Sequence, residues 1–242
     1  MKEKVIGILG GMGPEATLDC YFKIISSTPA KTDQEHLRVI IDSNPKVPDR
    51  TAAIVAEGES PVPILVAGCL TLQQAGADFI IIPCVSAHFF VDEIQSQVAL
   101  PILSIFDVVA ETIISDHPQI KTVGLLGTTG TIKGGLFQKR LSANGIETIV
   151  ADETHQSKVM EAIYDIKNSQ PGRSRAQIVS ELTAAADELI SKGARGIIAG
   201  CTEIPLALKQ EHLSVPYFDA LTILARAAIF EAGLTPIPGS MS

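Results

Sequence analysis

Two cysteines, Cys84 and Cys201, occupy matching positions in two similar stretches of the chain, residues 81–88 (IIPCVSAH) and 197–204 (IIAGCTEI). Each cysteine follows an apolar, β-branched run typical of a buried strand and precedes a helix-like segment. A thiol is an acid and its thiolate a base, and a helix N-terminus or a cation lowers a cysteine pKa below about 8.5. Two such groups could remove a proton from one face of a small molecule and return one to the other. The alternative is that both are small buried apolar side chains.

An internal repeat favours matching roles for these cysteines. Each is preceded by a strand-like run that ends in a glycine turn, and Gly7 and Gly124 correspond within those runs. The interval from Gly7 to Cys84 equals that from Gly124 to Cys201, 77 residues in each case (84 − 7 and 201 − 124). The chain therefore resembles two copies of one half-domain.

The order of elements predicts an α/β fold. Strands that alternate with helices form doubly wound parallel sheets, which bind ligands beyond the carboxyl ends of their strands. We expect two pseudo-symmetric halves, residues 1–117 with Cys84 and 118–242 with Cys201, and an active site in the cleft between them. The last helix, about 221–234, can pack back on the first half.

Hydrophobic periodicity places these elements along the chain. Strands are expected at 4–10, 38–42, 77–83, 101–105, 121–127, 146–150, 194–199 and 216–219. Helices are expected at 14–27, 61–75, 86–98, 107–116, 132–143, 153–167, 173–191 and 221–232.

Composition restricts the class of protein. The chain has 242 residues, 46% of them hydrophobic and 19% charged, and a formal net charge of −8. Scattered basic residues argue against a nucleic-acid or membrane surface, and no apolar run reaches the roughly 18 to 20 residues that span a bilayer. The N-terminus lacks the pattern of a signal peptide, so a soluble, cytoplasmic protein is expected. The four cysteines lack close metal-type spacing and should be reduced there.

The glycine-rich turn after the first strand allows two interpretations. Gly11-x-Gly13-x-x-Ala16 formally fits a dinucleotide fingerprint, with Asp42 as the ribose-binding acid. The equivalent turn of the second half, residues 127–131 (GTTGT), has no such fingerprint. Bare amides at a helix N-terminus also bind small anions such as a carboxylate, which is the interpretation we favour.

Three further side chains each have a functional and a structural interpretation. Arg50 follows a loop with two prolines and can fork onto a carboxylate, or can be a solvated loop arginine. His88 can stabilise a Cys84 thiolate or cap a helix start. Lys167 can reach the cleft or be a helix-terminal charge.

Two facing thiols suit the racemisation of an amino acid, because one base on each side removes and returns the α-proton. The α-hydrogen is far less acidic than a thiol, so the site must also stabilise a carbanion. Amides and hydroxyls of the 10–13 and 128–131 turns, Ser86 and Thr202 can supply donors. Glu203 can hold the ammonium group or tune Cys201.

Several ordered motifs carry a resemblance that covers essentially the whole chain. They are GGMGP at 10–14, DQEH at 33–36, the NP…PDRT loop at 44–51, PCVSAH at 83–88, TTGTI at 128–132 and GCTE at 200–203. Together they closely resemble the aspartate racemases, and the chain is identified as a member of the cofactor-independent aspartate/glutamate racemase superfamily.

This resemblance implies Cys84 and Cys201 as the opposed acid/base pair, with no pyridoxal phosphate and no metal. It maps recognition of the distal carboxylate onto Arg50 and, across a one-residue gap, onto Lys167. Family members are commonly dimers, so a homodimer is expected. The substrate-binding residues expected in all are Met12, Arg50, Val85, Ser86, Thr128, Thr129, Thr131, Lys167, Thr202 and Glu203, with His88 in support.

One position departs from the family pattern, and it keeps other functions open. The family usually has asparagine after the first cysteine, where this chain has Val85. Loss of that side chain is expected to weaken binding or carbanion stabilisation by about 1–3 kcal/mol, roughly 5- to 150-fold. The alternatives are therefore a relative of the hydantoin racemases or maleate isomerases, or a ligand-binding protein that has lost turnover. NAD binding and a structural zinc on Cys84, His88 and Cys201 are further alternatives.

Overall fold

The computed structural model describes residues 3–55, 58–168, 170 and 172–237. The chain divides into two compact units. One holds the chain up to Ala53, Gly58–Ile105 and the chain from Leu221 onward, and the other holds Phe106–Ala220 with the short segment that begins at Ile54. No helix within the described ranges is both long enough and apolar enough to cross a bilayer.

The sheet of the first unit is parallel, as expected. Its described strands are β1 (Ile6–Gly10), β2 (Val39–Ser43) and β3 (Phe79–Ile81), in the order β2-β1-β3. The strand expected at 101–105 is reduced to one bridge, Ile80 with Ile102. The next helix begins at Ile105.

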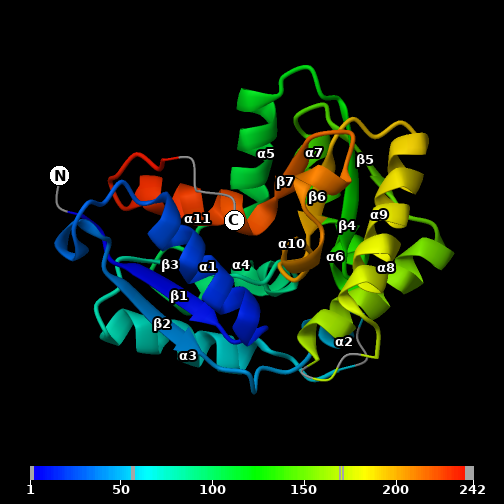
Figure 1. Ribbon diagram of the computed structural model, residues 1–242. Helices are drawn as coiled ribbons and strands as arrows, with labels where there is room; N and C mark the ends of the chain where they lie inside the picture. The colour runs from blue at the N-terminus through cyan, green and yellow to red at the C-terminus, as the bar shows by residue number, and fades with distance from the viewer. Residues whose placement is uncertain (1–2, 56–57, 169, 171, 238–242) are drawn as a thin grey trace. The chain divides into compact units, whose positions relative to one another are not determined.

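Helices cover both faces of this sheet. Figure 1 shows α1 (Pro14–Ser27) and α3 (Val62–Gln74) on opposite faces, and both pack against β1. Pro14 begins α1, where its missing N–H costs nothing and its fixed φ suits the helix. The remaining helical elements of the unit are η1 (Asp33–Glu35), α2 (Arg50–Ile54), η2 (Ser86–Phe90), α4 (Val91–Gln95) and α11 (Ala220–Glu231).

Two of those short elements differ from expectation. The sequence predicts one helix over 86–98, but the chain forms the 3₁₀ turn η2 and then α4, and Phe90, the last residue of η2, departs from helical geometry. Helix α2 was not expected, because the prolines that precede it favour a loop. Helix α11 belongs to the first unit, although it follows the second along the chain.

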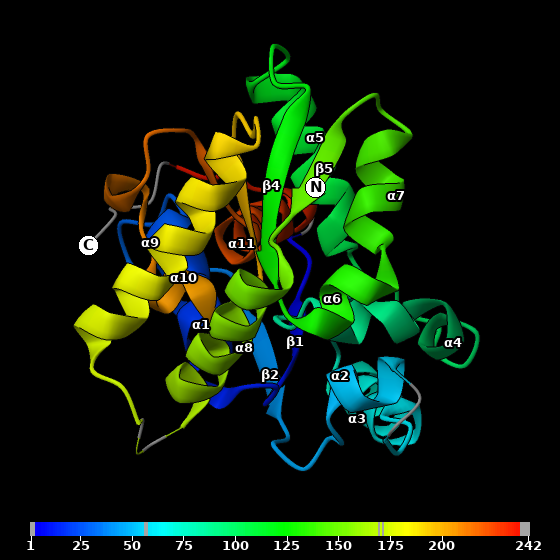
Figure 2. The same ribbon diagram turned by 90° about the vertical axis from the view of Figure 1, so that its right-hand side faces the viewer.

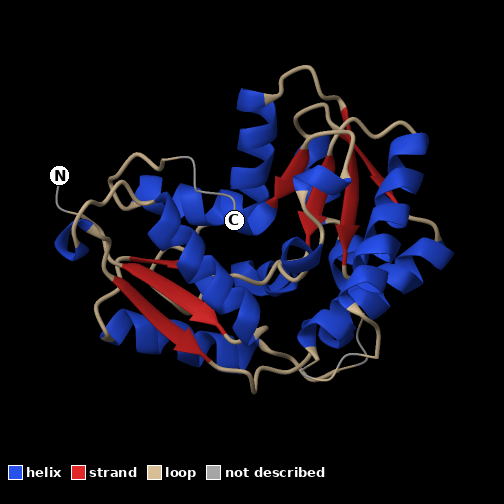
Figure 3. Cartoon of the chain, viewed as in Figure 1, coloured by secondary structure: helices blue, strands red, loops and turns tan. Residues whose placement is uncertain are grey.

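The second unit has the larger parallel sheet. Its described strands are β4 (Thr122–Gly127), β5 (Glu147–Val150), β6 (Ile197–Gly200) and β7 (Tyr217–Asp219), in the order β5-β4-β6-β7. In Figure 3 the arrows of β4 and β6 point the same way. The expected fold class, α/β with two parallel sheets, is confirmed.

The helices of the second unit lie on both sides of β4. Figure 2 shows α8 (Glu153–Lys167) and α9 (Arg175–Ser191) on one side and α7 (Leu136–Ser142) on the other. The sequence predicts one helix over 132–143. The chain instead forms α6 (Thr129–Gly134) and α7, because Gly135 between them adopts a φ of 66°, in the left-handed region. The other helical elements here are α5 (Ile105–Asp116), α10 (Ile204–Ala207) and η3 (Gln210–His212).

The register of the two sheets matches around the cysteines. Gly7 lies opposite Ile80 in the first unit, and Gly124 lies opposite Ile197 in the second. Each of these partners precedes a cysteine by four residues (84 − 80 and 201 − 197). Each cysteine therefore follows a strand that pairs in the same register with the central strand of its sheet.

Candidate active site

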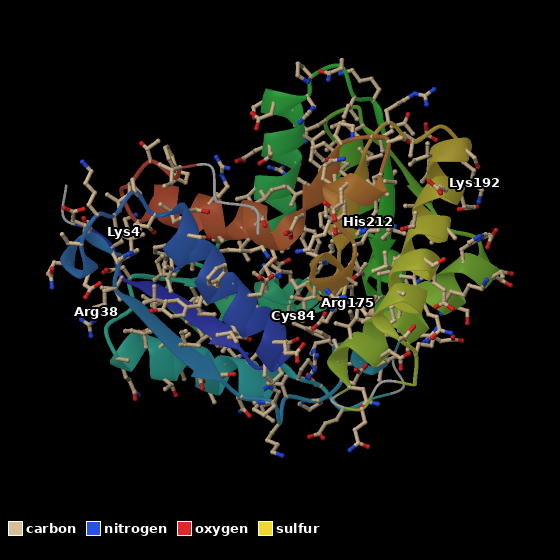
Figure 4. The ribbon with its side chains drawn as sticks, viewed as in Figure 1. Lys4, Arg38, Cys84, Arg175, Lys192 and His212 are labelled. Atoms are coloured by element: carbon tan, nitrogen blue, oxygen red, sulfur yellow. The ribbon has the colours of Figure 1, made fainter. Side chains whose placement is uncertain are left out.

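Cys84 follows β3 at the carboxyl end of the first sheet. Figure 4 places it at the opposite end of this unit from Lys4 and Arg38, which lie near the amino ends of β1 and β2. Its side chain is free of disulfides and its residue is 5% exposed. Its N–H donates to the Ile82 carbonyl at 2.7 Å, and its own carbonyl accepts from the Ala87 N–H at 3.2 Å. These bonds bend the chain sharply at the cysteine.

His88 fastens the same turn. Its Nδ1 lies 3.0 Å from the Cys84 carbonyl oxygen, and the ring is buried. A carbonyl only accepts, so Nδ1 carries the hydrogen in this contact. The imidazole therefore holds the backbone that presents the thiol, whereas the sequence left open whether it acts on the thiolate or caps a helix.

The glycines of the first turn are explained by close packing. A Cβ on Gly11, whose φ is 93°, would lie 2.4 Å from the Asn44 backbone. A Cβ on Gly10 would lie 2.3 Å from a methyl group of Thr17, whose hydroxyl accepts the Gly11 N–H at 2.8 Å. Neither requirement involves a nucleotide, so Gly11, the first glycine of the formal dinucleotide fingerprint, has a structural cause.

Arg50 lies in contact with that turn. Its guanidinium donates to the carbonyls of Val47 at 3.2 Å, Pro48 at 3.0 Å and Met12 at 3.4 Å. The side chain is half-buried and holds the proline loop against the glycine turn. This position differs from that of a solvated loop arginine, one of the two alternatives for this residue.

The residues around Cys84 are mainly apolar. Met12 is 2% exposed and belongs to the same buried cluster as Cys84. Val85, at the start of η2, is 3% exposed, and Ser86 is 8% exposed. The described residues next to Cys84 in the first unit therefore include buried hydrocarbon side chains, the His88 imidazole and the Ser86 hydroxyl.

Cys201 has a different environment, because a buried carboxylate contacts it. Its Sγ donates to Glu203 Oε2 at 2.9 Å, and the Thr202 hydroxyl lies 3.4 Å from the same oxygen. The other carboxylate oxygen lies 3.6 Å from Lys167 Nζ at the end of α8. Glu203 is 2% exposed. The structure therefore brings together Lys167, Thr202, Glu203 and Cys201, all expected site residues.

These contacts govern the acidity of Cys201. Burial raises the pKa of the thiol well above its usual value, and the negative charge of Glu203 raises it further. The positive charge of Lys167 acts in the opposite direction on that pKa. Burial likewise raises the pKa of Tyr217 well above its usual value, with contributions from Asp219 and Cys201.

The threonines of the second turn cap α6. Thr128 Oγ1 accepts the Thr131 N–H at 3.0 Å and lies 3.0 Å from the Thr131 hydroxyl. The Thr129 N–H points to Met160 Sδ at 3.1 Å, and Gln156 Nε2 donates to the Gly127 carbonyl at 3.0 Å. Two hydroxyls and a helix N-terminus thus lie at the carboxyl end of β4.

Some residues that contact these sites were not predicted from the sequence. Tyr217 packs against the buried cluster that contains Cys201, and its hydroxyl is buried with no hydrogen-bond partner in the part of the chain that the structure describes. Its position in an apolar strand gave no signal. The role of Thr17 was not predicted either, although its position one helical turn after the glycine turn places its hydroxyl within reach of that turn.

Acidic and histidine side chains also gather elsewhere in the second unit. Asp152, His155 and Glu188 have potential ligand atoms within 4.8 Å of one another, and none of the cysteines belongs to this group. Asp152 accepts the His155 N–H at 2.9 Å as the N-cap of α8. Glu188 is paired with Lys192, a cation that competes with any metal.

Comparisons with known proteins identify the family of the chain. A family model described as Asp/Glu/Hydantoin racemase matches residues 9–228. The chain is 31% identical over 231 residues to the broad specificity amino-acid racemase RacX of Bacillus subtilis (strain 168), covering 93% of this chain and 96% of that protein.

Solved structures give the same result. An aspartate racemase of Picrophilus torridus superposes with a TM-score of 0.86 and 29% identity, covering 97% of this chain and 96% of that chain. An aspartate racemase homologue from Pyrococcus horikoshii OT3 gives 0.73 and 31%, covering 95% and 99%. A glutamate racemase of Bacillus anthracis, 18% identical with a TM-score of 0.67 over 97% of this chain and 85% of that chain, shares the fold.

Proposed function

The chain belongs to the Asp/Glu/hydantoin racemase family, and from that premise we propose that it interconverts L- and D-aspartate by two-base proton transfer without a cofactor. It is an isomerase of the racemase type, as its family and its racemase relatives indicate. The proposal concerns the substrate, the two cysteines and the residues that serve them.

The observation that carries the proposal is the equivalence of the two cysteines. Cys84 follows β3 and Cys201 follows β6, and both strands pair in the same register with the central strand of their sheet. Parallel sheets bind ligands beyond the carboxyl ends of their strands. A duplicated half-domain thereby supplies two thiols, one for each face of a single substrate.

The reaction then needs one thiolate and one thiol. The thiolate removes the α-proton from one face of aspartate and becomes a thiol, while the opposite thiol gives its proton to the other face and becomes a thiolate. One S–H bond forms and one breaks, and one C–H bond breaks and one forms. The next substrate molecule, of opposite configuration, restores the starting state.

The carbanion requires donors on the α-carboxylate. We assign this role to the α6 N-terminus with the hydroxyls of Thr128 and Thr131, together with Thr129, Thr202 and Ser86. Amides and hydroxyls that point at a developing negative charge stabilise it most where water is excluded. Met12 and Val85 supply apolar walls next to Cys84, and His88 holds the turn that carries it.

Arg50 and Lys167 are the cations proposed to recognise the distal carboxylate. Arg50 belongs to the first unit and Lys167 to the second. In the described chain each is already engaged, Arg50 with backbone carbonyls and Lys167 with Glu203. A dicarboxylate substrate would therefore compete with these contacts, a cost that favours a strongly anionic side chain over a neutral one.

A wider substrate range is the second candidate, and it rests on two observations. The relative RacX is described as a broad specificity amino-acid racemase, and Val85 replaces the asparagine usual in the family at a position that would touch the substrate. Glutamate and neutral amino acids therefore belong in the assay. Hydantoin racemase-like or maleate isomerase-like activity, and ligand binding without turnover, are its other possible outcomes.

The setting of the enzyme is also part of the proposal. We propose a cytoplasmic homodimer that acts on a small molecule and needs neither nucleic acid nor membrane. Sedimentation of the purified chain at micromolar concentration tests the dimer, since a species with the 25.6 kDa mass of one chain would contradict it.

The decisive assay uses enzyme that has been dialysed against EDTA and kept reduced. L-aspartate is incubated with it, and the D-isomer is measured by chiral chromatography, followed by L-glutamate and a panel of neutral amino acids. Aspartate turnover without added cofactor is the expected result. If aspartate raises the melting temperature but is never converted, the chain is a binding protein and the proposal fails.

A further inference from the structure

The buried carboxylate of Glu203 is committed to two neighbours that have opposite effects on Cys201. Oxygen Oε2 accepts from the Cys201 thiol at 2.9 Å, and Oε1 lies 3.6 Å from Lys167 Nζ. Glu203 is 2% exposed and the Cys201 residue 5% exposed, so water screens these interactions poorly. The three groups form a row from α8 to the turn after β6.

The thiol contact has a direction. A carboxylate only accepts hydrogen bonds, so this one requires the proton on Cys201. Loss of that proton would place a thiolate against a carboxylate, two negative charges in a buried site. Glu203 therefore favours the protonated form of Cys201 through both the hydrogen bond and the charge.

Lys167 limits this effect without reversing it. Its ammonium group offsets part of the charge of Glu203, and its side chain is 27% exposed, so solvent weakens its contribution. The phenol of Tyr217 on β7 is a further ionisable group that interacts electrostatically with Cys201, and it also interacts with Asp219. Burial keeps Tyr217 protonated and neutral, because it raises the pKa of the phenol.

In the first unit, the position that corresponds to Glu203 does not hold a carboxylate. The residue two positions after Cys84 is Ser86, where the second unit has Glu203. The backbone bonds of Cys84 and the His88 ring on its carbonyl oxygen hold that turn.

We propose that Glu203 is a positioning residue that keeps Cys201 protonated in the free enzyme, with its charge partly offset by Lys167, so that Cys201 starts as the proton donor and Cys84 as the base. Glu203 is then no ligand of the substrate ammonium group. The assignment rests on the proposed function, since it gives each cysteine its part in the two-base reaction. Its chemical content, the acidity of one thiol, is measurable without any substrate.

The test is the rate at which each cysteine reacts with iodoacetamide at pH 8, resolved by mass spectrometry of the Cys201 and Cys84 peptides. A one-unit fall in pKa gives about ten times more thiolate but a weaker nucleophile, a net gain of about threefold. Glu203→Gln is expected to speed the labelling of Cys201 at least about threefold. Lys167→Gln is expected to slow it by a similar factor.

Matched controls separate this effect from loosening of the fold. Glu211→Gln and Lys158→Gln make the same chemical changes at exposed positions and should leave Cys201 labelling unchanged. Loosening would speed labelling in both site variants, whereas charge control predicts opposite directions. The labelling of Cys84 and of buried Cys20 should stay constant throughout.

Three results would overturn the assignment. The first is labelling of Cys201 that is no faster in Glu203→Gln than in the unaltered protein. The second is a change in the same direction for Glu203→Gln and Lys167→Gln, and the third is a rise that Cys20 shares. Each result stands apart from the proposed function, because an inactive chain can still show charge control and an active racemase can lack it.

Discussion

The turn after β3 and the turn after β6 have the same backbone plan and different chemistry. Both place a buried cysteine directly beyond a strand that lies beside the centre of a parallel sheet. The Cys84 turn is fixed by backbone bonds and by His88, whereas the Cys201 thiol donates to the carboxylate of Glu203. A duplicated fold thus fixes where two thiols lie, and a few side chains nearby decide which form each prefers.

The glycine turns that precede them differ in a similar way. In the first unit the Gly11 N–H is satisfied by Thr17 from inside α1, and the N-cap Gly13 offers no side chain. In the second unit Thr128 caps α6 with its own hydroxyl. Only the second turn therefore caps its own helix with a side chain, whereas in the first turn the nearby hydroxyl comes from within α1 and binds the residue that follows β1.

Removal of either thiol should cause the largest loss of activity, and it tests whether the two cysteines are equivalent. Cys84→Ser and Cys201→Ser should each lower kcat/KM for aspartate racemisation by about 10² to 10⁴, the usual contribution of one general acid or base. Chiral chromatography of initial rates measures the loss. The control is Cys20→Ala, a change at a buried position of α1, which should keep most of the activity if the fold is stable. A loss in only one of the two serine variants would break the comparison.

The residue after each cysteine offers the next test. Val85→Asn restores the side chain usual in the family, and it should raise kcat/KM by about 5- to 150-fold, equivalent to 1–3 kcal/mol of transition-state stabilisation. Thr202 already supplies a polar group at the corresponding place of the second turn. An unchanged rate in a variant that melts normally would mean that Val85 does not limit catalysis.

The glycine turn of the first unit makes a prediction about stability. Gly11→Ala puts a Cβ at a φ of 93° and within 2.4 Å of the Asn44 backbone, while Gly76→Ala has a φ of 91° and no heavy atom within 4 Å. Gly76→Ala should cost about 1–2 kcal/mol for the left-handed conformation alone. Gly11→Ala should cost clearly more in urea unfolding. Equal costs would show that the close approach to Asn44 is unimportant.

The raised pKa values of two buried thiols should make the free energy of unfolding fall at alkaline pH. The pKa of Cys201 is raised in the folded chain, so its contribution to stability is complete below the unfolded value near 8.5 and is lost as pH rises toward the folded value. Burial and the charge of Asp42 raise the pKa of the Cys69 thiol to about 12, so its contribution to stability should be lost over the same direction of pH change. Above about pH 9, Cys201→Ala and Cys69→Ala should each reduce the fall in unfolding free energy by up to about 1.4 kcal/mol per pH unit. Unfolding curves parallel to those of the unaltered protein would contradict this.

Much of the fold follows from patterns that the sequence displays. Strand and helix periodicities, Pro14 at a helix start and the equal spacing of the two cysteines are local signals, and they predicted parallel sheets and α1 to the residue. The failures are short elements. The strand expected at 101–105 forms only one bridge, and Gly135 divides a helix that periodicity alone would continue.

The site was predictable where it depends on strand ends and less so where it depends on side-chain contacts. The sequence marked Glu203 and Lys167 but left their roles open, because only the fold brings the end of α8 to within 3.6 Å of the turn after β6. Tyr217 gave no signal, since a tyrosine in an apolar strand is ordinary and its buried hydroxyl appears only when neighbouring strands and helices pack around it.

The central claim, one base on each face of the substrate, is tested most directly by where deuterium first appears. Either pure enantiomer of aspartate is incubated in D₂O, and the reaction is stopped when about a tenth has been converted, with the isotope content of each enantiomer measured by mass spectrometry after chiral separation. If one cysteine acts on each face, nearly all the product should carry deuterium at Cα and the remaining substrate almost none. Comparable deuterium in both enantiomers would mean that a single base serves both faces, and would contradict the account.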